Sequence, residues 1–116
     1  MTQTRKISKL NTVVFRHPDG TPREVIFHET SVFRATLPDA DGWRLITLAH
    51  GGWITSTTQA RINQALSEIG LPFRVSRAGG VMRLYCGGTS EVRGTALGGV
   101  WRIWPVTAGG TTFKVR

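Results

Sequence analysis

The chain has 116 residues, of which 40% are hydrophobic and 9% aromatic, so it has the composition of one globular domain and not of a disordered protein. Fifteen Lys and Arg face seven Asp and Glu, giving a formal net charge of +8. With Cys86 as its single cysteine the chain cannot form an internal disulfide, and it has no run of about 18 apolar residues that would span a membrane. We therefore expect a single domain over residues 1–116 in the cytoplasm, with residues 1–9 as a flexible basic arm.

The charge is divided unevenly along the chain. Residues 1–23 carry a net charge of +4, residues 24–69 a net charge of −2 and residues 70–116 a net charge of +6. Two basic ends flank an acidic middle, and this asymmetry favours an acidic partner such as nucleic acid. The alternative interpretation is that the charge only keeps the protein in solution.

Short stretches rich in Val, Ile, Phe, Trp and Thr alternate with glycine-containing breaks, a rhythm that is typical of an antiparallel sheet of short strands. Eight strands are predicted: Thr12–Arg16, Glu24–His28, Val32–Thr36, Trp43–Ala49, Phe73–Arg77, Val81–Cys86, Val100–Pro105 and Thr112–Val115. Residues 18–22 and 39–42 have the composition of hairpin turns.

One amphipathic helix is predicted over residues 57–69. Ser56 and Gln59 have the spacing of a capping box, in which the Ser56 hydroxyl accepts from the backbone N–H of Gln59. Four apolar residues then recur with helical spacing and are expected to be buried: Ile62, Ala65, Leu66 and Ile69. Gly70 and Pro72 end the helix. The predicted fold class is therefore α+β, an antiparallel sheet of short strands and hairpins with this helix packed on it.

The segment Gly51–Gln64 combines a glycine pair and an aromatic residue, a double threonine and the helix start Arg-Ile-Asn-Gln. In these features it resembles a segment of small uncharacterised proteins of bacteriophages and prophages. The similarity extends over residues 25–86, whereas residues 87–116 have no counterpart. The resemblance implies a phage or mobile-element origin, with roles in handling phage nucleic acid or in countering host defence. A protein encoded by a phage would act in the host cytoplasm. A purely structural interpretation is that the glycine pair turns the chain and that Trp53 anchors the core.

The sequence contains no motif of a catalytic or metal site. The three histidines and Cys86 lack the local spacing of zinc ligands, and His17 is expected to be solvated at a turn. His28, Glu29 and Ser31 suggest no hydrolase, because neighbouring residues of a strand point to opposite faces. We therefore expect a binding protein that is not an enzyme and holds no cofactor or metal ion.

The hairpin over residues 73–86 provides the main candidate site, with either Gly79-Gly80 or Ala78-Gly79 as its two-residue turn. Both turns keep Arg74, Ser76, Arg83 and Tyr85 on one face, and the pairs below are those of the Gly79-Gly80 turn. On one face this register predicts two pairs of polar residues: Arg74–Tyr85 and Ser76–Arg83. The other face is expected to carry three apolar pairs: Phe73–Cys86, Val75–Leu84 and Ala78–Val81. Two arginines and a tyrosine on one sheet face can grip a phosphate and stack a base. The alternative is an ordinary solvent-exposed face.

Five further residues are candidates for the same nucleic-acid interface: Arg61, Asn63, Gln64, Arg77 and Arg102. The first three belong to the predicted helix, outside its apolar stripe. Arg102 lies between Trp101 and Trp104 in a predicted strand, where an exposed Trp would suit stacking on a base or docking onto a protein.

The sequence thus predicts a small basic phage or mobile-element protein that binds nucleic acid or a host nucleoprotein complex. The alternative is a phage-encoded inhibitor of a host defence system, of the anti-CRISPR type, that acts by protein–protein binding. An inhibitor that imitates DNA would be acidic, so an inhibitor with this charge would engage an acidic surface or a bound guide RNA.

Overall fold

The computed structural model describes residues 4–5, 12–86, 92–94 and 103–116. In these ranges the chain forms one helix and ten strands, and the strands belong to two antiparallel sheets. The fold is therefore α+β with the helix packed on a sheet, which confirms the predicted class.

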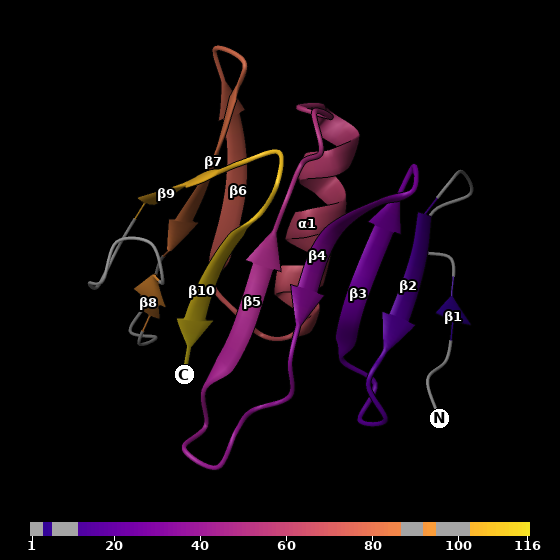
Figure 1. The fold of residues 1–116 in the computed structure, drawn as a ribbon, viewed down its shortest axis with the longest axis vertical. Helices are drawn as coiled ribbons and strands as arrows, with labels where there is room; N and C mark the ends of the chain where they lie inside the picture. Colours follow the sequence, from indigo (N-terminus) through magenta and orange to yellow (C-terminus); the bar gives the residue numbers. More distant parts are fainter. Residues whose placement is uncertain (1–3, 6–11, 87–91, 95–102) are drawn as a thin grey trace.

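The larger sheet has seven strands. Their order across the sheet is β1 (Thr4–Arg5), β2 (Thr12–Arg16), β3 (Pro22–Phe27), β4 (Thr30–Ala35), β5 (Arg44–Leu48), β10 (Thr111–Val115) and β8 (Val92–Gly94). From β1 to β5 the order in space follows the order in the chain, whereas β10 returns from the C-terminal end to lie beside β5 (Figure 1).

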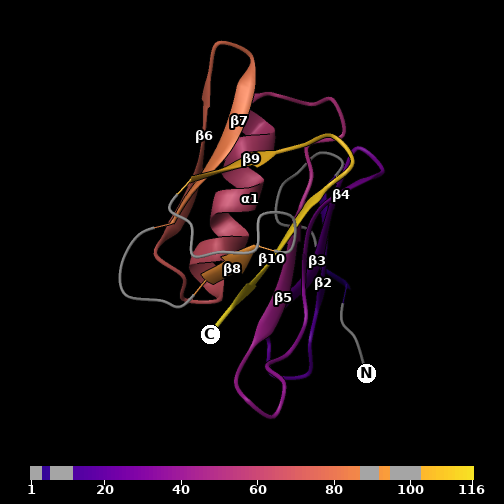
Figure 2. The same ribbon diagram turned by 60° about the vertical axis from the view of Figure 1, so that its left-hand side comes forward.

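The smaller sheet has three strands in the order β6 (Phe73–Ala78), β7 (Val81–Cys86) and β9 (Ile103–Val106). The helix α1 (Ser56–Glu68) lies beside β6 and contacts β3 and β4 of the larger sheet. Figure 2 shows α1 with the β6–β7 hairpin on one side and strands β2–β5 on the other. The molecule therefore has two layers, and each sheet has an outer face directed away from the other layer.

The core between the layers is built from alternate residues of the strands. In β5, Ile46 and Leu48 are fully buried, whereas Leu45 lies on the outer face of the larger sheet. Phe113 of β10 pairs with Ile46, and its ring centre lies 6.2 Å from that of Phe73 in the smaller sheet. This aromatic contact joins the two sheets across the core.

The apolar stripe of α1 is confirmed for three of its four members, Ile62, Ala65 and Leu66, which are fully buried. Ile69 is only partly buried and packs at the margin of the core. The helix ends at Glu68, so Ile69 is its C-cap and no longer follows the helical repeat.

The helix begins one residue earlier than predicted, and the predicted capping box is wrong. Thr55 is the N-cap, in an extended conformation with φ −128° and ψ 163°, and its hydroxyl accepts from the backbone N–H of Thr58 at 3.3 Å. Ser56 is instead the first helical residue. Both residues carry the hydroxyl that a cap requires, so residue type alone did not distinguish them.

The predicted strands are found with small shifts of their ends. Two have the predicted bounds, β2 and β7, and most of the others shift by one or two residues. The short strands β1 and β8 were not predicted. The predicted strand Val100–Pro105 overlaps β9, and its residues 100–102 lie outside the described residues.

The turn between β3 and β4 corrects one expectation. Phe27 pairs with Thr30, so His28 and Glu29 form a two-residue turn, with φ of 48° and 63°. The sequence predicts His28 in a strand, because neither residue is the glycine or asparagine that such turns prefer. A pair of residues other than glycine in the left-handed region is uncommon and strained.

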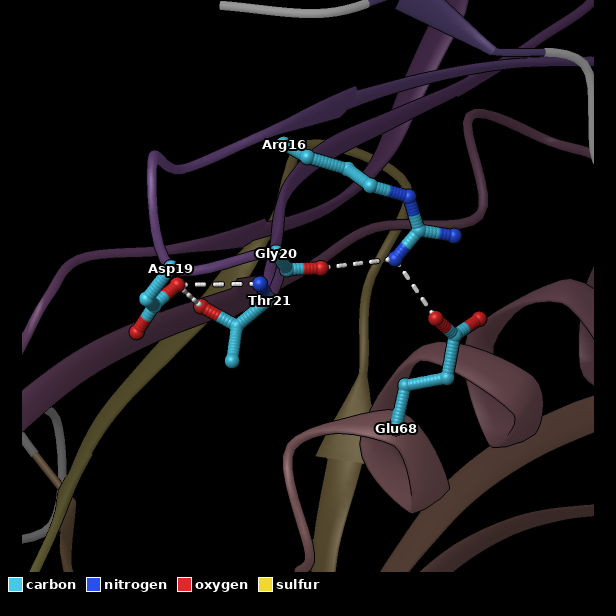
Figure 3. Close-up of polar contacts among 5 residues, drawn as sticks. All are labelled: Arg16, Asp19, Gly20, Thr21 and Glu68. Atoms are coloured by element: carbon cyan, nitrogen blue, oxygen red, sulfur yellow. Dashed lines mark hydrogen bonds and ion pairs between the residues drawn. The ribbon is translucent and has the colours of Figure 1, made fainter.

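A polar link joins β2 to the end of the helix (Figure 3). Arg16 Nη1 donates to Glu68 Oε1 at 2.6 Å and to the backbone oxygen of Gly20 at 3.0 Å. The last turn of α1 contains no basic residue, so Arg16 supplies the positive charge that is favourable near a helix C-terminus. This contact helps to fix the end of α1 over the larger sheet.

Candidate nucleic-acid interface

The β6–β7 hairpin lies beside α1 and extends to one end of the molecule (Figure 1). Gly79 and Gly80 form its two-residue turn with φ of 58° and 74°, values that glycine adopts without strain. Arg74 pairs with Tyr85, and Ser76 pairs with Arg83. The predicted register of the hairpin is therefore confirmed.

These four residues lie together on the outer face of the smaller sheet, and all are exposed. Tyr85 has 41% of its surface exposed. Arg74 Nη1 donates to the backbone oxygen of Phe73 at 2.7 Å, which engages one of the five N–H donors of the guanidinium group. The Arg83 side chain makes no hydrogen bond or ion pair with any residue of the described ranges. The face therefore presents two guanidinium groups next to one phenol ring.

One part of the predicted division between the faces is wrong. Ala78 and Val81 do pair, but they lie on the outer face with Arg74 and are exposed. Side chains alternate along a strand, so Ala78 cannot share a face with Val75 three residues earlier. On the inner face Val75 and its partner Leu84 are both buried, and Met82 is buried opposite the exposed Arg77.

Arg77 lies apart from the outer-face arginines. Arg77 pairs with Met82, so it belongs to the face of the hairpin opposite to that of Arg74. Its Nε donates to Gln59 Oε1 of α1 at 3.1 Å. Its side chain is exposed but directed towards the helix. Arg102 and its neighbour Trp101 lie outside the described residues.

The three candidates on α1 are not brought to the outer face of the smaller sheet. Arg61 Nε donates to Thr12 Oγ1 of β2 at 3.3 Å, and Gln64 is exposed on the helix. The side-chain amide of Asn63 makes two hydrogen bonds to the backbone of Val75 in β6, one through its nitrogen and one through its oxygen. The structure thus gives Asn63 a role in joining helix and sheet.

The charge of the hairpin is wholly positive. Strands β6 and β7 contain three arginines and no acidic residue. Because no carboxylate lies in either strand, nothing within the hairpin opposes the approach of a phosphate group.

Two interpretations of the sequence that concern ring side chains in connecting segments are wrong. Trp53 does not anchor the core but is 43% exposed, and its ring stacks on that of His28 with centres 5.1 Å apart. His17 is partly buried rather than solvated, because its Nε2 lies 2.7 Å from the backbone oxygen of Ala35. Neither contact has a local sequence signal, since each joins segments that are distant in the chain.

Two absences are found in the part of the chain that the structure describes. No three His, Cys, Asp or Glu side chains gather there in an arrangement that would hold a metal ion. No helix within the same residues is long and apolar enough to cross a membrane.

Comparison with known proteins gives a family for most of the chain. The model of the Kyanoviridae Gp96 protein, a cyanophage protein, matches residues 1–90. No curated protein and no solved structure matches the chain significantly. The match confirms the expected phage origin without testing the segment Gly51–Gln64 itself. The chain therefore belongs to the Kyanoviridae Gp96 protein family of phage proteins.

Proposed function

We propose that this phage protein binds single-stranded nucleic acid, alone or within a host nucleoprotein complex, through the outer face of the smaller sheet. The observation that carries the proposal is the exposed cluster of Arg74, Arg83 and Tyr85 on paired strands. Guanidinium groups form charge-assisted hydrogen bonds to phosphate oxygens, and a phenol ring offers a stacking surface to a base.

The spacing of the cluster suits an extended strand of nucleic acid. Arg74 lies opposite Tyr85, so Arg83 is its diagonal neighbour, and diagonal neighbours in a sheet lie about 7–8 Å apart. The two charges can therefore contact different phosphates while Tyr85 contacts a base. A plane of paired strands holds these side chains in fixed relative positions, which lowers the entropic cost of binding.

The net charge of the chain supports the same partner. With a formal charge of +8, the protein attracts polyanions over a distance set by the ionic strength. Long-range attraction brings nucleic acid to every basic part of the surface. The outer face of the smaller sheet then supplies the close contacts.

The test is fluorescence anisotropy with a labelled single-stranded oligonucleotide and a matched duplex, measured over a range of salt concentrations. The logarithm of affinity should fall linearly with the logarithm of salt, with a slope of about −0.7 per phosphate contact on a single strand. The double variant Arg74→Ala/Arg83→Ala should lose two contacts and so flatten the slope. Tyr85→Ala should weaken binding without changing the slope.

A control variant separates a local site from net charge. Arg23→Ala/Lys114→Ala removes the same amount of charge from exposed positions of the larger sheet. All four positions are exposed, so each substitution should alter the free energy of unfolding by less than about 0.5 kcal/mol. Equal weakening by the two double variants would reduce the interaction to charge alone. An absence of binding to both oligonucleotides would leave an inhibitor that binds protein.

A further inference from the structure

The outer face of the larger sheet carries an open depression that the proposed nucleic-acid site does not use. Its volume is about 500 Å³, and Leu37 and Leu45 form its apolar lining. These residues are 42% and 38% exposed, so they belong to the few large apolar residues that lie exposed in the described part of the chain. Arg23, Arg34 and His17 also line the depression, at its polar side.

Two β-bulges bring the arginines to this place. In the first, Phe15 pairs with Glu24 and Arg16 with Pro22, so Arg23 is an extra residue without a partner in β2. An extra residue bends its strand and redirects the side chains around it. Arg23 is exposed as a result, and its guanidinium lies 5.4 Å from the ring centre of Phe15.

The second bulge lies in β4. Val25 pairs with Phe33 and Ile26 with Ser31, so Val32 is the extra residue. Its insertion directs Phe33 into the core and turns Arg34 to the outer face. Bulges are frequent next to functional sites, where they aim particular side chains, and here both flank one depression.

The charge around the depression is mainly positive. Arg34 Nε donates to Glu24 Oε2 at 3.0 Å, yet 66% of the arginine side chain remains exposed. Lys114 of β10 pairs with Leu45 and is exposed beside it. Arg23 adds a third cation, whereas Glu24 is the one acidic residue among those that line the depression.

We propose that this depression docks an acidic peptide segment of a partner protein that carries a large apolar side chain. The apolar side chain would cover Leu37 and Leu45, and carboxylates beside it would pair with Arg23, Arg34 and Lys114. Burial of apolar surface at the centre with charged pairs at the rim is the usual arrangement of a protein interface.

Charge and chemistry favour this occupant over two others. Two leucines form the apolar part of the lining, and its one aromatic ring, that of His17, is held by the contact of Nε2 with the Ala35 backbone oxygen, so the depression offers a base little to stack on. A second copy of the chain would bring its own cationic face against this one, because a two-fold interface joins the same patch on both subunits. The acidic peptide meets both the apolar lining and the positive rim.

The docking surface is independent of the proposed nucleic-acid site. Its lining belongs mainly to β3, β4 and β5 of the larger sheet, whereas Arg74, Arg83 and Tyr85 belong to the β6–β7 hairpin. Figure 2 shows this hairpin and those strands in different layers. One molecule has therefore two separate surfaces for two kinds of partner. Failure of one proposal leaves the other standing.

The test uses three labelled short peptides and the full chain. The first alternates glutamate with leucine, the second replaces the leucines by serine, and the third replaces the glutamates by lysine. Only the first combines the two required features, so it should bind at least about tenfold more tightly than either of the others. Equal binding of the glutamate–serine peptide, or no binding of the first peptide, would overturn the proposal.

Variants then place the peptide on the protein. Leu45→Ser should lower the affinity for the first peptide by about tenfold or more, because it removes part of the apolar contact. Val81→Ser is the matched control, since Val81 is 39% exposed but lies on the smaller sheet, and it should leave the affinity unchanged. Arg34→Gln should weaken binding and reduce its dependence on salt, whereas Arg74→Ala/Arg83→Ala should have no effect.

Two results would assign the depression to another occupant. If Leu45→Ser weakens oligonucleotide binding as much as peptide binding, the face belongs to the nucleic-acid site. If the parent protein sediments as a dimer and Leu45→Ser as a monomer, the face joins two copies of the chain. Either result overturns the acidic-peptide proposal.

Discussion

The side-chain amide of Asn63 bonds to both backbone polar groups of Val75. Its Nδ2 donates to the Val75 oxygen at 3.1 Å, and its Oδ1 accepts from the Val75 N–H at 2.6 Å. Val75 lies in β6, which is the edge strand of the smaller sheet among the described residues, so no described strand pairs with those groups. A helix side chain thus takes the place of a neighbouring strand and covers an edge that would otherwise be open to pairing.

Replacing Asn63 should destabilise the fold markedly. Asn63→Ala removes both hydrogen bonds and leaves a partly buried donor and acceptor unsatisfied, which should cost about 1–3 kcal/mol. Asn63→Asp is more specific, because it keeps the acceptor for the Val75 N–H but places a second oxygen against the Val75 oxygen. We expect this substitution to lower the free energy of unfolding as well. Urea denaturation followed by tryptophan fluorescence measures both variants.

Gln64→Ala is the control, because Gln64 is exposed on the same helix. It should change the free energy of unfolding by less than about 0.5 kcal/mol. Equal stability of the Asn63→Ala and Gln64→Ala variants would contradict a structural role for the amide.

The features that the sequence predicted well are those with local causes. The apolar spacing of Ile62 and Leu66 marks a helix face without reference to the rest of the chain. The turn at Gly79–Gly80 sets the register of the whole hairpin, so the pairing of Arg74 with Tyr85 followed from the turn alone.

The features that were missed depend on contacts between distant segments. Asn63 meets Val75 only because α1 lies against β6, and no pattern within the helix shows this. The bulged residues Arg23 and Val32 interrupt the alternation of their strands, which is the signal that strand prediction uses. Trp53 is apolar enough for the core, yet its place is decided by the turn that holds His28.

A second prediction concerns Gly51, whose φ is +59°. A Cβ atom at this position would lie 2.5 Å from Thr30 Cγ2, closer than side chains approach each other. Gly51→Ala should therefore lower the free energy of unfolding by more than the left-handed backbone conformation alone would. The overlap should add about 1–3 kcal/mol. Gly79→Ala is the matched control, because Gly79 has φ +58° and nothing within 4 Å of its Cβ position.

The overlap itself can be tested by a double variant. Thr30→Ser removes the methyl group that the new Cβ would meet. In that background Gly51→Ala should lose part of its penalty, and thermal unfolding of the four proteins of the cycle measures the coupling. Equal penalties for Gly51→Ala and Gly79→Ala would show that the backbone conformation accounts for the whole effect.

A third prediction compares two ion pairs that differ in burial. The Arg16 side chain is 13% exposed in its pair with Glu68, whereas the Arg34 side chain is 66% exposed in its pair with Glu24. Glu68→Gln should cost about 1.5–3 kcal/mol, because it weakens a charge-assisted bond to a mostly buried guanidinium. Glu24→Gln should cost less than about 1 kcal/mol, as exposed pairs do. Chemical denaturation at low and high salt measures both, and equal losses would contradict the assignment of Arg16 as a structural link.

The last prediction concerns Asp19 in the turn between β2 and β3 (Figure 3). Its Oδ1 accepts from the Thr21 hydroxyl at 2.6 Å and from the Thr21 backbone N–H at 2.9 Å. The bond from the hydroxyl, followed by the bond from the backbone, holds the pKa of Asp19 below its ordinary value of 3.8. Both bonds favour the ionised carboxylate, because a carboxylate only accepts hydrogen bonds.

Thr21→Val removes the hydroxyl donor and keeps the backbone N–H, so the pKa of Asp19 should rise but stay below the value of a free side chain. Thr21→Ser keeps a hydroxyl and should leave that pKa low. Because the folded-state pKa is depressed, the turn contributes stability above the unfolded-state pKa and loses it as the pH falls through the folded-state pKa. The parent protein should therefore lose more stability than Thr21→Val on acidification through this range. Carboxyl NMR titration of the three proteins measures the pKa directly, and the same pKa in Thr21→Val as in the parent would show that the hydroxyl is not the cause.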